Sequence, residues 1–120
     1  ASAPPIPQGG DSLSRALAAA AENIGDIAGV DDLTALAATS RRSLERHMRE
    51  RLGISPRGWI DEQRVITACR LLETTSGSIE DIARSAGFGS PPTLRRALLA
   101  ERGVTPTAYR SMFHSNDGSC

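Results

Sequence analysis

A repeat constrains this chain more than any other feature of its sequence, because residues 40–59 match residues 90–109 without a gap. The matched positions carry a serine, a leucine, an arginine, a glycine, a proline and an aromatic residue, in the pairs Ser40 and Ser90, Leu44 and Leu94, Arg46 and Arg96, Gly53 and Gly103, Pro56 and Pro106, and Trp59 and Tyr109. Self-similarity of this kind indicates that one supersecondary unit occurs twice. Any fold of the chain must therefore build the same helical unit in both places.

Each copy carries the signals of a capped helix. A serine, which is a favoured N-cap, comes first, and a glycine, which favours the left-handed C-cap, comes last. Between them a leucine is followed four residues later by methionine or leucine, so that one side of the helix is apolar. A Ser-Pro or Thr-Pro pair follows the glycine, and it can cap another helix while proline fills the first turn. Each copy therefore predicts a helix of about three turns, followed at once by a second helix.

The remaining residues predict further helices and no strands. Residues 1–10, rich in proline and glycine, indicate a linker, and residues 114–120 a disordered polar tail. We predict a single all-α domain over residues 11–113, with about seven helices arranged as two helix-turn-helix subdomains joined by a long central helix. The expected bounds are about 31–52 for the first unit, about 56–74 for the central helix, about 79–102 for the second unit, and about 106–113 for a last helix.

Charge is distributed unevenly along the chain, although the net charge is zero. Residues 39–58 hold six arginines and two acids, and residues 90–110 hold four arginines and one acid. Contact with phosphate is made by one face of a domain, so local charge bears on nucleic-acid binding more than the total does. The two repeats are therefore the candidate nucleic-acid surfaces.

The second helix of a helix-turn-helix enters the major groove, where its side chains meet base edges. In the first copy the apolar stripe is expected to point inward, so the charged positions project from the opposite side. The candidate base-reading residues are Arg42, Glu45, Arg46, Arg49, Arg95 and Arg96. The candidate phosphate-contacting residues are Ser40, Arg41, Ser43, Ser90, Pro92 and Thr93. A solvated charged face is the ordinary alternative, but the positive excess, the N-cap and the duplication favour DNA.

The two copies are not expected to contribute equally. Pro92 and Leu99 stand where the first copy has Arg42 and Arg49, and neither can donate a hydrogen bond to a base. We expect the first unit to carry most of the sequence reading and the second mainly to hold the DNA backbone. A central helix of about nineteen residues would span about 28 Å, close to the roughly 34 Å of one duplex turn. Both units could then face one side of the DNA, at a non-palindromic site.

Other classes of function find little support in the residues. His47 and Cys69 are the one conceivable nucleophilic pair, but no motif supplies an orienting carboxylate, so we predict no catalysis. His47 has no second ligand four residues away, and no metal or cofactor is expected. Trp59 and Tyr109 are expected to anchor the core and not to stack on bases. No membrane-spanning or signal segment is expected, and two cysteines without a CxxC spacing fit a reducing, cytoplasmic setting.

Two stretches resemble the AraC/XylS family of transcriptional regulators, namely IEDIARSAGFGSPPTLRRAL at 79–98 and GVTPTAYR at 103–110. The first unit, LTALAATSRRSLERHM, is similar with three departures: Thr34 replaces the usual alanine, Ala38 the usual glycine, and Met48 the common phenylalanine. The resemblance covers about residues 13–113. It implies a DNA-binding domain with two helix-turn-helix units joined by a long helix.

The resemblance also implies partners. It implies a double-stranded DNA operator, RNA polymerase as a further partner, and an upstream sensor domain on the same chain. PPIPQGG, at residues 4–10, resembles the segment that in one branch of the family follows an amidotransferase-like sensor domain. The alternative function from another class is a helical protein-interaction module, whose basic faces bind an acidic partner. Salt-dependent binding that prefers one DNA sequence would separate the two.

Overall fold

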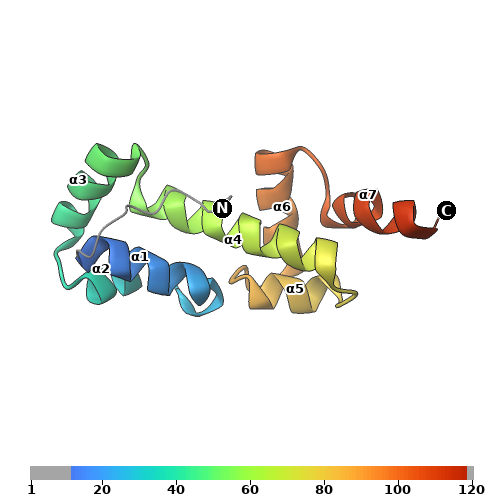
Figure 1. The fold of residues 1–120 in the computed structure, drawn as a ribbon, viewed down its shortest axis with the longest axis horizontal. Helices are drawn as coiled ribbons and strands as arrows, with labels where there is room; N and C mark the ends of the chain where they lie inside the picture. Colours follow the sequence, from blue (N-terminus) through green and yellow to red (C-terminus); the bar gives the residue numbers. More distant parts are fainter. Residues whose placement is uncertain (1–11, 119–120) are drawn as a thin grey trace. The chain divides into compact units, whose positions relative to one another are not determined.

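The computed structural model of the chain describes residues 12–118, with side chains described as far as His114. The described residues form seven α-helices and one short 3-10 helix (Figure 1). The elements are α1 (Ser12–Glu22), η1 (Ile24–Asp26), α2 (Val30–Ala37), α3 (Arg41–Leu52), α4 (Pro56–Thr74), α5 (Ile79–Ser85), α6 (Pro91–Arg102) and α7 (Pro106–Gly118). The predicted all-α class, with two helix-turn-helix units joined by a long helix, is confirmed. The predicted linker at 1–10 and Cys120 lie outside the described residues.

The chain divides into two compact units, Ala1–Gln63 and Arg64–Cys120. We call these unit 1 and unit 2. The boundary lies inside α4, so this one helix begins in unit 1 and ends in unit 2. Unit 1 contains the pair α2 and α3, and unit 2 contains the pair α5 and α6 (Figure 1). Each copy of the repeat therefore belongs to its own packing unit.

The core of unit 1 forms around the indole of Trp59, which is fully buried. Helix α2 contributes Leu33, and α3 contributes Leu44 and Met48, none of which is more than 1% exposed. Burying an apolar side chain of this size contributes about 1.5–3 kcal/mol, so these positions hold α3 with one side inward. The expectation that Trp59 anchors the core is confirmed.

The core of unit 2 is built in the same way, with Leu94 and Leu98 of α6 fully buried. Tyr109, the counterpart of Trp59, is only partly buried at the edge of this core. Its ring lies against Phe113 with centroids 4.9 Å apart, and its hydroxyl donates a hydrogen bond to the Glu73 carboxylate. A phenol can pack its ring while its hydroxyl keeps a polar partner, which explains why Tyr109 stays at the rim. Burial and the Glu73 bond together raise the pKa of Tyr109.

Helix α7 continues to Gly118, whereas the sequence pattern ends it near Phe113 and predicts a disordered tail from 114. That expectation is wrong over residues 114–118. The guanidinium of Arg110 donates to the Thr75 carbonyl over 3.0 Å, and the Nε2 atom of His114 lies 3.0 Å from the Leu72 carbonyl. These side chains meet carbonyls at the end of α4, where the helix itself supplies no further donors. Side-chain contacts of this kind, between helices distant in the chain, are invisible in a local pattern.

The first helix of each helix-turn-helix, α2 in unit 1 and α5 in unit 2, ends in the same way. Ala38 after α2 is left-handed with φ 54°, and Gly87 after α5 is left-handed with φ 94°. The closing hydrogen bonds also match, from the N–H of Thr39 to the Thr34 carbonyl at 3.1 Å and from the N–H of Phe88 to the Ala83 carbonyl at 2.8 Å. Unit 2 then has one more residue before its cap serine. Glycine reaches this conformation without strain, and an alanine does not.

Replacing Ala38 by glycine should therefore stabilise the fold. A left-handed alanine costs about 1–2 kcal/mol, and the added flexibility of glycine in the unfolded chain offsets roughly 0.4–1 kcal/mol of the gain. We expect Ala38→Gly to raise the free energy of unfolding by up to about 1 kcal/mol in urea denaturation. Ala35→Gly is the matched control, because Ala35 is an exposed residue inside α2 and the same change there should cost about 1 kcal/mol. Equal destabilisation by both changes would show that the left-handed conformation of Ala38 does not lower the stability of the fold.

Candidate nucleic-acid interface

The four predicted base-reading residues of α3 lie together on one exposed face of the helix. Arg42, Glu45, Arg46 and Arg49 are all exposed. We call this set the outer face of α3. It lies opposite the buried stripe of Leu44 and Met48, as the helical spacing predicts. Three guanidinium groups and one carboxylate are thereby presented within two turns.

The arginines of this face are available to contact a ligand, because ion pairs in the described part of the chain do not hold them. Within the described residues, none of Arg42, Arg46 and Arg49 forms an ion pair. Arg41 differs, because its guanidinium lies 3.6 Å from the Asp31 carboxylate at the start of α2. Both side chains of that pair are well exposed, so the pair contributes little and an anion can replace it. The outer face of α3 can therefore meet a polyanion without first breaking internal bonds.

The N-terminus of α3 also favours an anion. The Ser40 hydroxyl accepts a hydrogen bond from the N–H of Ser43 over 3.1 Å, which confirms the expected cap. The N–H groups of Arg41 and Arg42 lie in the first turn, where a helix supplies no backbone acceptor. Together with the helix dipole they make this end a suitable place for a phosphate.

The start of α6 differs from that of α3 in a way that revises the expectation for the second copy. The Ser90 hydroxyl makes no cap hydrogen bond to the backbone and instead lies 3.0 Å from the Thr93 hydroxyl. Pro91 and Pro92 occupy the first two helical positions and have no N–H. In the first turn of α6 only the N–H group of Thr93 is therefore left to contact an anion. The first turn of α6 has fewer donors for phosphate than the first turn of α3.

The corresponding face of α6 mixes charge with apolar surface. Arg95, Arg96 and Pro92 are exposed, and Leu99 is 44% exposed. We call these four residues the outer face of α6. Pro92, expected to contact phosphate, has no donor to offer one. The second copy thus exposes both of its predicted readers, Arg95 and Arg96, beside two apolar side chains.

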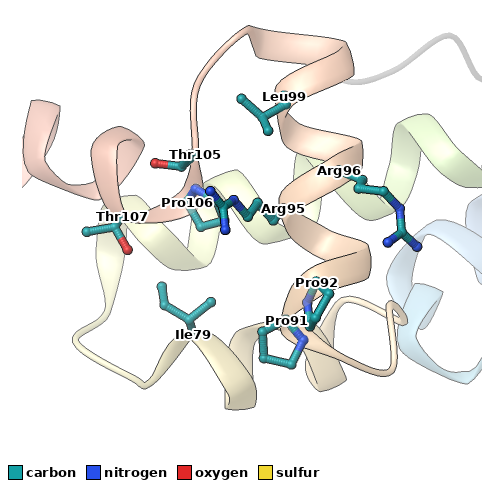
Figure 2. Close-up of a pocket in the computed structure, with 9 residues that line it drawn as sticks. All are labelled: Ile79, Pro91, Pro92, Arg95, Arg96, Leu99, Thr105, Pro106 and Thr107. Carbon is teal, nitrogen blue, oxygen red and sulfur yellow. The ribbon is translucent and has the colours of Figure 1, made fainter.

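An open hollow of about 780 Å³ lies beside the outer face of α6, within unit 2. Its walls come from the starts of α5 and α7 as well as from α6, and its lining residues are Ile79, Pro91, Pro92, Arg95, Arg96, Leu99, Thr105, Pro106 and Thr107. Figure 2 shows Arg95 and Leu99 extending from α6 toward Thr105 and Pro106, with Arg96 on the other side of the helix. The sequence pattern marks Thr105 only as a helix cap, a role confirmed by the 3.1 Å bond from the N–H of Ala108. It gives no signal that Thr107 or Ile79 lies here.

The residues considered for catalysis lie in different units. His47 is half-buried on α3 of unit 1, and Cys69 is buried in the core of unit 2. Burial raises the pKa of the Cys69 thiol, which keeps it protonated and a poor nucleophile at neutral pH. The part of the chain that the structure describes contains no cluster of three or more His, Cys, Asp or Glu residues that could hold a metal ion. Over the same residues, no helix has the length and apolar character needed to cross a membrane.

A family model described as a helix-turn-helix domain matches residues 33–112 of the chain. Solved structures are similar over most of the chain. The DNA-binding domain of AdpA, described as the global transcriptional factor and solved in complex with a target DNA, is 36% identical with a TM-score of 0.84, covering 89% of this chain and 96% of that one. A transcriptional regulator from Chromobacterium violaceum, described as having an AraC-type DNA-binding domain, is 32% identical with a TM-score of 0.75, covering 83% of this chain and 89% of that one.

Curated relatives are similar to the chain over only part of their own length. An HTH-type transcriptional regulator of Mycobacterium tuberculosis is 32% identical over 84 residues, covering 70% of this chain and 32% of that protein. ExsA of Pseudomonas aeruginosa is 41% identical over 58 residues, covering 48% of this chain and 21% of that protein. A probable bifunctional transcriptional activator and DNA repair enzyme, AlkA of Mycobacterium tuberculosis, is 34% identical over 101 residues, covering 84% of this chain and 20% of that protein. The chain spans a third or less of the length of these proteins.

The unequal caps predict unequal effects of the same substitution on stability. Ser40→Ala removes an N-cap hydrogen bond, which should lower the free energy of unfolding by about 1 kcal/mol. Ser90→Ala removes only a bond between two hydroxyls, so its cost should be clearly smaller. Thermal or urea denaturation of the two variants under identical conditions measures the difference. Equal losses would show that the Ser90 hydroxyl stabilises α6 as well as the Ser40 hydroxyl stabilises α3.

Proposed function

Because the chain belongs to the AraC-type helix-turn-helix family, we propose that it binds duplex DNA with sequence specificity, as the DNA-binding part of a bacterial transcriptional regulator. The observation that carries the proposal is the outer face of α3, where three arginines without ion pairs within the described residues follow a capped helix start. The same scaffold occurs again in unit 2. The likeness to a domain solved with its target DNA supports the same function.

In the proposed complex, α3 and α6 each enter the major groove, in successive segments of one duplex. The units are two repeats of a single chain that differ in sequence, and not identical chains of a dimer, so the operator should be non-palindromic and about two turns long. The proposed base readers are Arg42, Glu45, Arg46 and Arg49 on α3, with Arg95 on α6; Arg96 can also read a guanine, but its main proposed role is contact with phosphate. Arginine binds guanine through a bidentate pair of hydrogen bonds, and glutamate accepts from cytosine.

Phosphate contacts are assigned to the helix starts. In unit 1 these are the hydroxyls of Ser40 and Ser43, the side chain of Arg41, and the N–H groups of the first turn. In unit 2 they are Ser90 and Thr93. Since α6 begins with two prolines, unit 2 has fewer backbone donors for this task. Unit 1 therefore supports both sequence reading and positioning.

We also propose an upstream domain, a protein partner and a cellular location for this chain. We infer that a sensor domain precedes this part in the same polypeptide, on the resemblance of PPIPQGG to a family linker and on the short share of each relative that the chain covers. Contact with RNA polymerase and a cytoplasmic location follow from the proposed role in transcription. The repair activity named for the bifunctional relative is not proposed, because the chain covers 20% of that protein.

Substituting single arginines should separate base reading from phosphate contact. The operator is first obtained by selecting the duplexes that the protein binds most tightly from a random pool. Arg46→Ala should weaken binding to this selected operator by about 1–3 kcal/mol and relax preference at particular base pairs. Arg96→Ala should weaken all sequences nearly equally and reduce the salt slope by about one. Both variants would be titrated against a panel of single-base operator variants at two salt concentrations. A larger change in base preference for Arg96→Ala than for Arg46→Ala would reverse the assigned roles.

The salt dependence of the unaltered protein tests the function itself. Because the excess of positive charge is limited to the two repeats, the slope of log affinity against log salt should correspond to about four to seven neutralised phosphates. Affinity for the selected operator should exceed affinity for unrelated duplex by at least about a thousandfold. A protein-interaction module with basic faces would show weak binding with no preference among duplexes. That result would refute sequence-specific DNA binding.

A further inference from the structure

The outer face of α6 has an apolar centre. At 3.6 residues per turn, Pro92 and Leu99 fall between Arg95 and Arg96 around the helix axis. Figure 2 shows Arg95 and Arg96 extending to opposite sides of α6, with Leu99 on the side of Arg95. The two arginines therefore flank two apolar positions that lie about 10 Å apart along the helix axis. We call Pro92 and Leu99 the strip of α6.

The equivalent strip on α3 is charged. Arg42 and Arg49 occupy the positions of Pro92 and Leu99 in the first copy of the repeat, and both are exposed. The two units thus share the buried stripe and the flanking positions but differ at the middle of the outer face. Guanine and phosphate suit the α3 strip, since both accept hydrogen bonds from arginine. Neither group has any special attraction for a leucine.

The exposure of Leu99 calls for more than a packing explanation. Leu94 and Leu98 of the same helix are fully buried, whereas Leu99 is 44% exposed and contributes to no core cluster within the described residues. A single exposed leucine is ordinary on a protein surface. Here the leucine lies two helical turns from an exposed Pro92 on the outer face, and both line a hollow whose wall also includes the apolar Ile79 and Pro106. Two apolar side chains therefore stand on the part of α6 that would face base edges in the proposed complex.

Among the groups that bases expose in the major groove, the 5-methyl of thymine is the apolar one. We propose that unit 2 recognises thymine, through contact of a 5-methyl group with Leu99 or, two turns earlier on the helix, with Pro92, while Arg95 and Arg96 contact the neighbouring guanines or phosphates. This inference rests on the proposed DNA binding and names the base class that unit 2 selects. It revises the expectation that unit 2 mainly holds the backbone. The operator should then contain one or more thymines in the half bound by unit 2.

Removing the methyl group from the DNA tests the contact without altering the protein. Each thymine of the selected operator would be replaced singly by deoxyuridine, which has the same hydrogen-bonding groups, and the Kd measured by fluorescence anisotropy. Burying a methyl-sized group contributes about 0.8 kcal/mol, which corresponds to about a fourfold weaker Kd at each contacted thymine. The effect should persist at raised salt, because no charge is involved.

Variants locate the contact on the protein. With Leu99→Ala, replacing the contacted thymine by deoxyuridine should change Kd by much less than fourfold. Leu99→Met keeps an apolar side chain of similar volume and should retain the effect. Arg49→Ala is the matched control, since it alters the repeat-equivalent position of unit 1 and should weaken binding while leaving the fourfold effect in the unit 2 half intact. Leu99 lies outside the core, so its replacement should leave the unfolding transition unchanged.

The outcomes separate this inference from the proposed function. Specific binding to an operator that lacks thymine in the unit 2 half would overturn thymine recognition. So would deoxyuridine substitutions without effect, or an effect that survives in both Leu99→Ala and Pro92→Ala. In each of these cases the protein remains a sequence-specific DNA-binding domain. Failure to prefer any duplex over another would instead refute the function, and thymine recognition with it.

Discussion

The burial of one apolar stripe on the second helix of each unit sets what the rest of that helix can do. Leu44 and Met48 on α3, and Leu94 and Leu98 on α6, are no more than 1% exposed. Turning either helix about its axis would bring these side chains into water, at about 1.5–3 kcal/mol for each one. A helix that buries one side exposes the other, so the stripe fixes which residues form the outer face.

Duplication allows the two outer faces to diverge on a shared scaffold. Substitutions there leave the core untouched, so Arg49 and Leu99 can stand at equivalent positions without cost to either fold. Helix starts diverge as well, because two prolines at the start of α6 remove N–H groups that α3 retains. Unit 1 is accordingly rich in charge and donors, and unit 2 presents apolar surface between two arginines. Under the proposed function, this asymmetry suits a chain that meets a non-palindromic site.

Local signals explain why so much of the helical architecture was predictable. Ser40, Ser78 and Thr105 each accept a backbone hydrogen bond at a helix start, within three residues along the chain. Interactions of this range depend on sequence alone, as does the left-handed glycine at the end of α3. Where a distant partner intervenes, the prediction is wrong: α7 extends to Gly118, and its side chains Arg110 and His114 meet carbonyls near the end of α4.

The sequence by itself determined the repeat, the helix starts, the helix ends other than that of α7, the inward stripe and the four positions of each outer face, because helical periodicity and capping act over a few residues. Only the tertiary structure decided three further features. It placed the hydroxyl of Ser90 against Thr93, left Ala38 in a left-handed conformation, and brought Ile79, Thr105 and Thr107 beside the outer face of α6. The Ser90–Thr93 contact spans only three residues, but capping signals alone did not separate it from a cap bond to the backbone, whereas the other two features depend on how helices pack against one another. That packing is set by the shapes of buried side chains far apart in the chain, which no local pattern records.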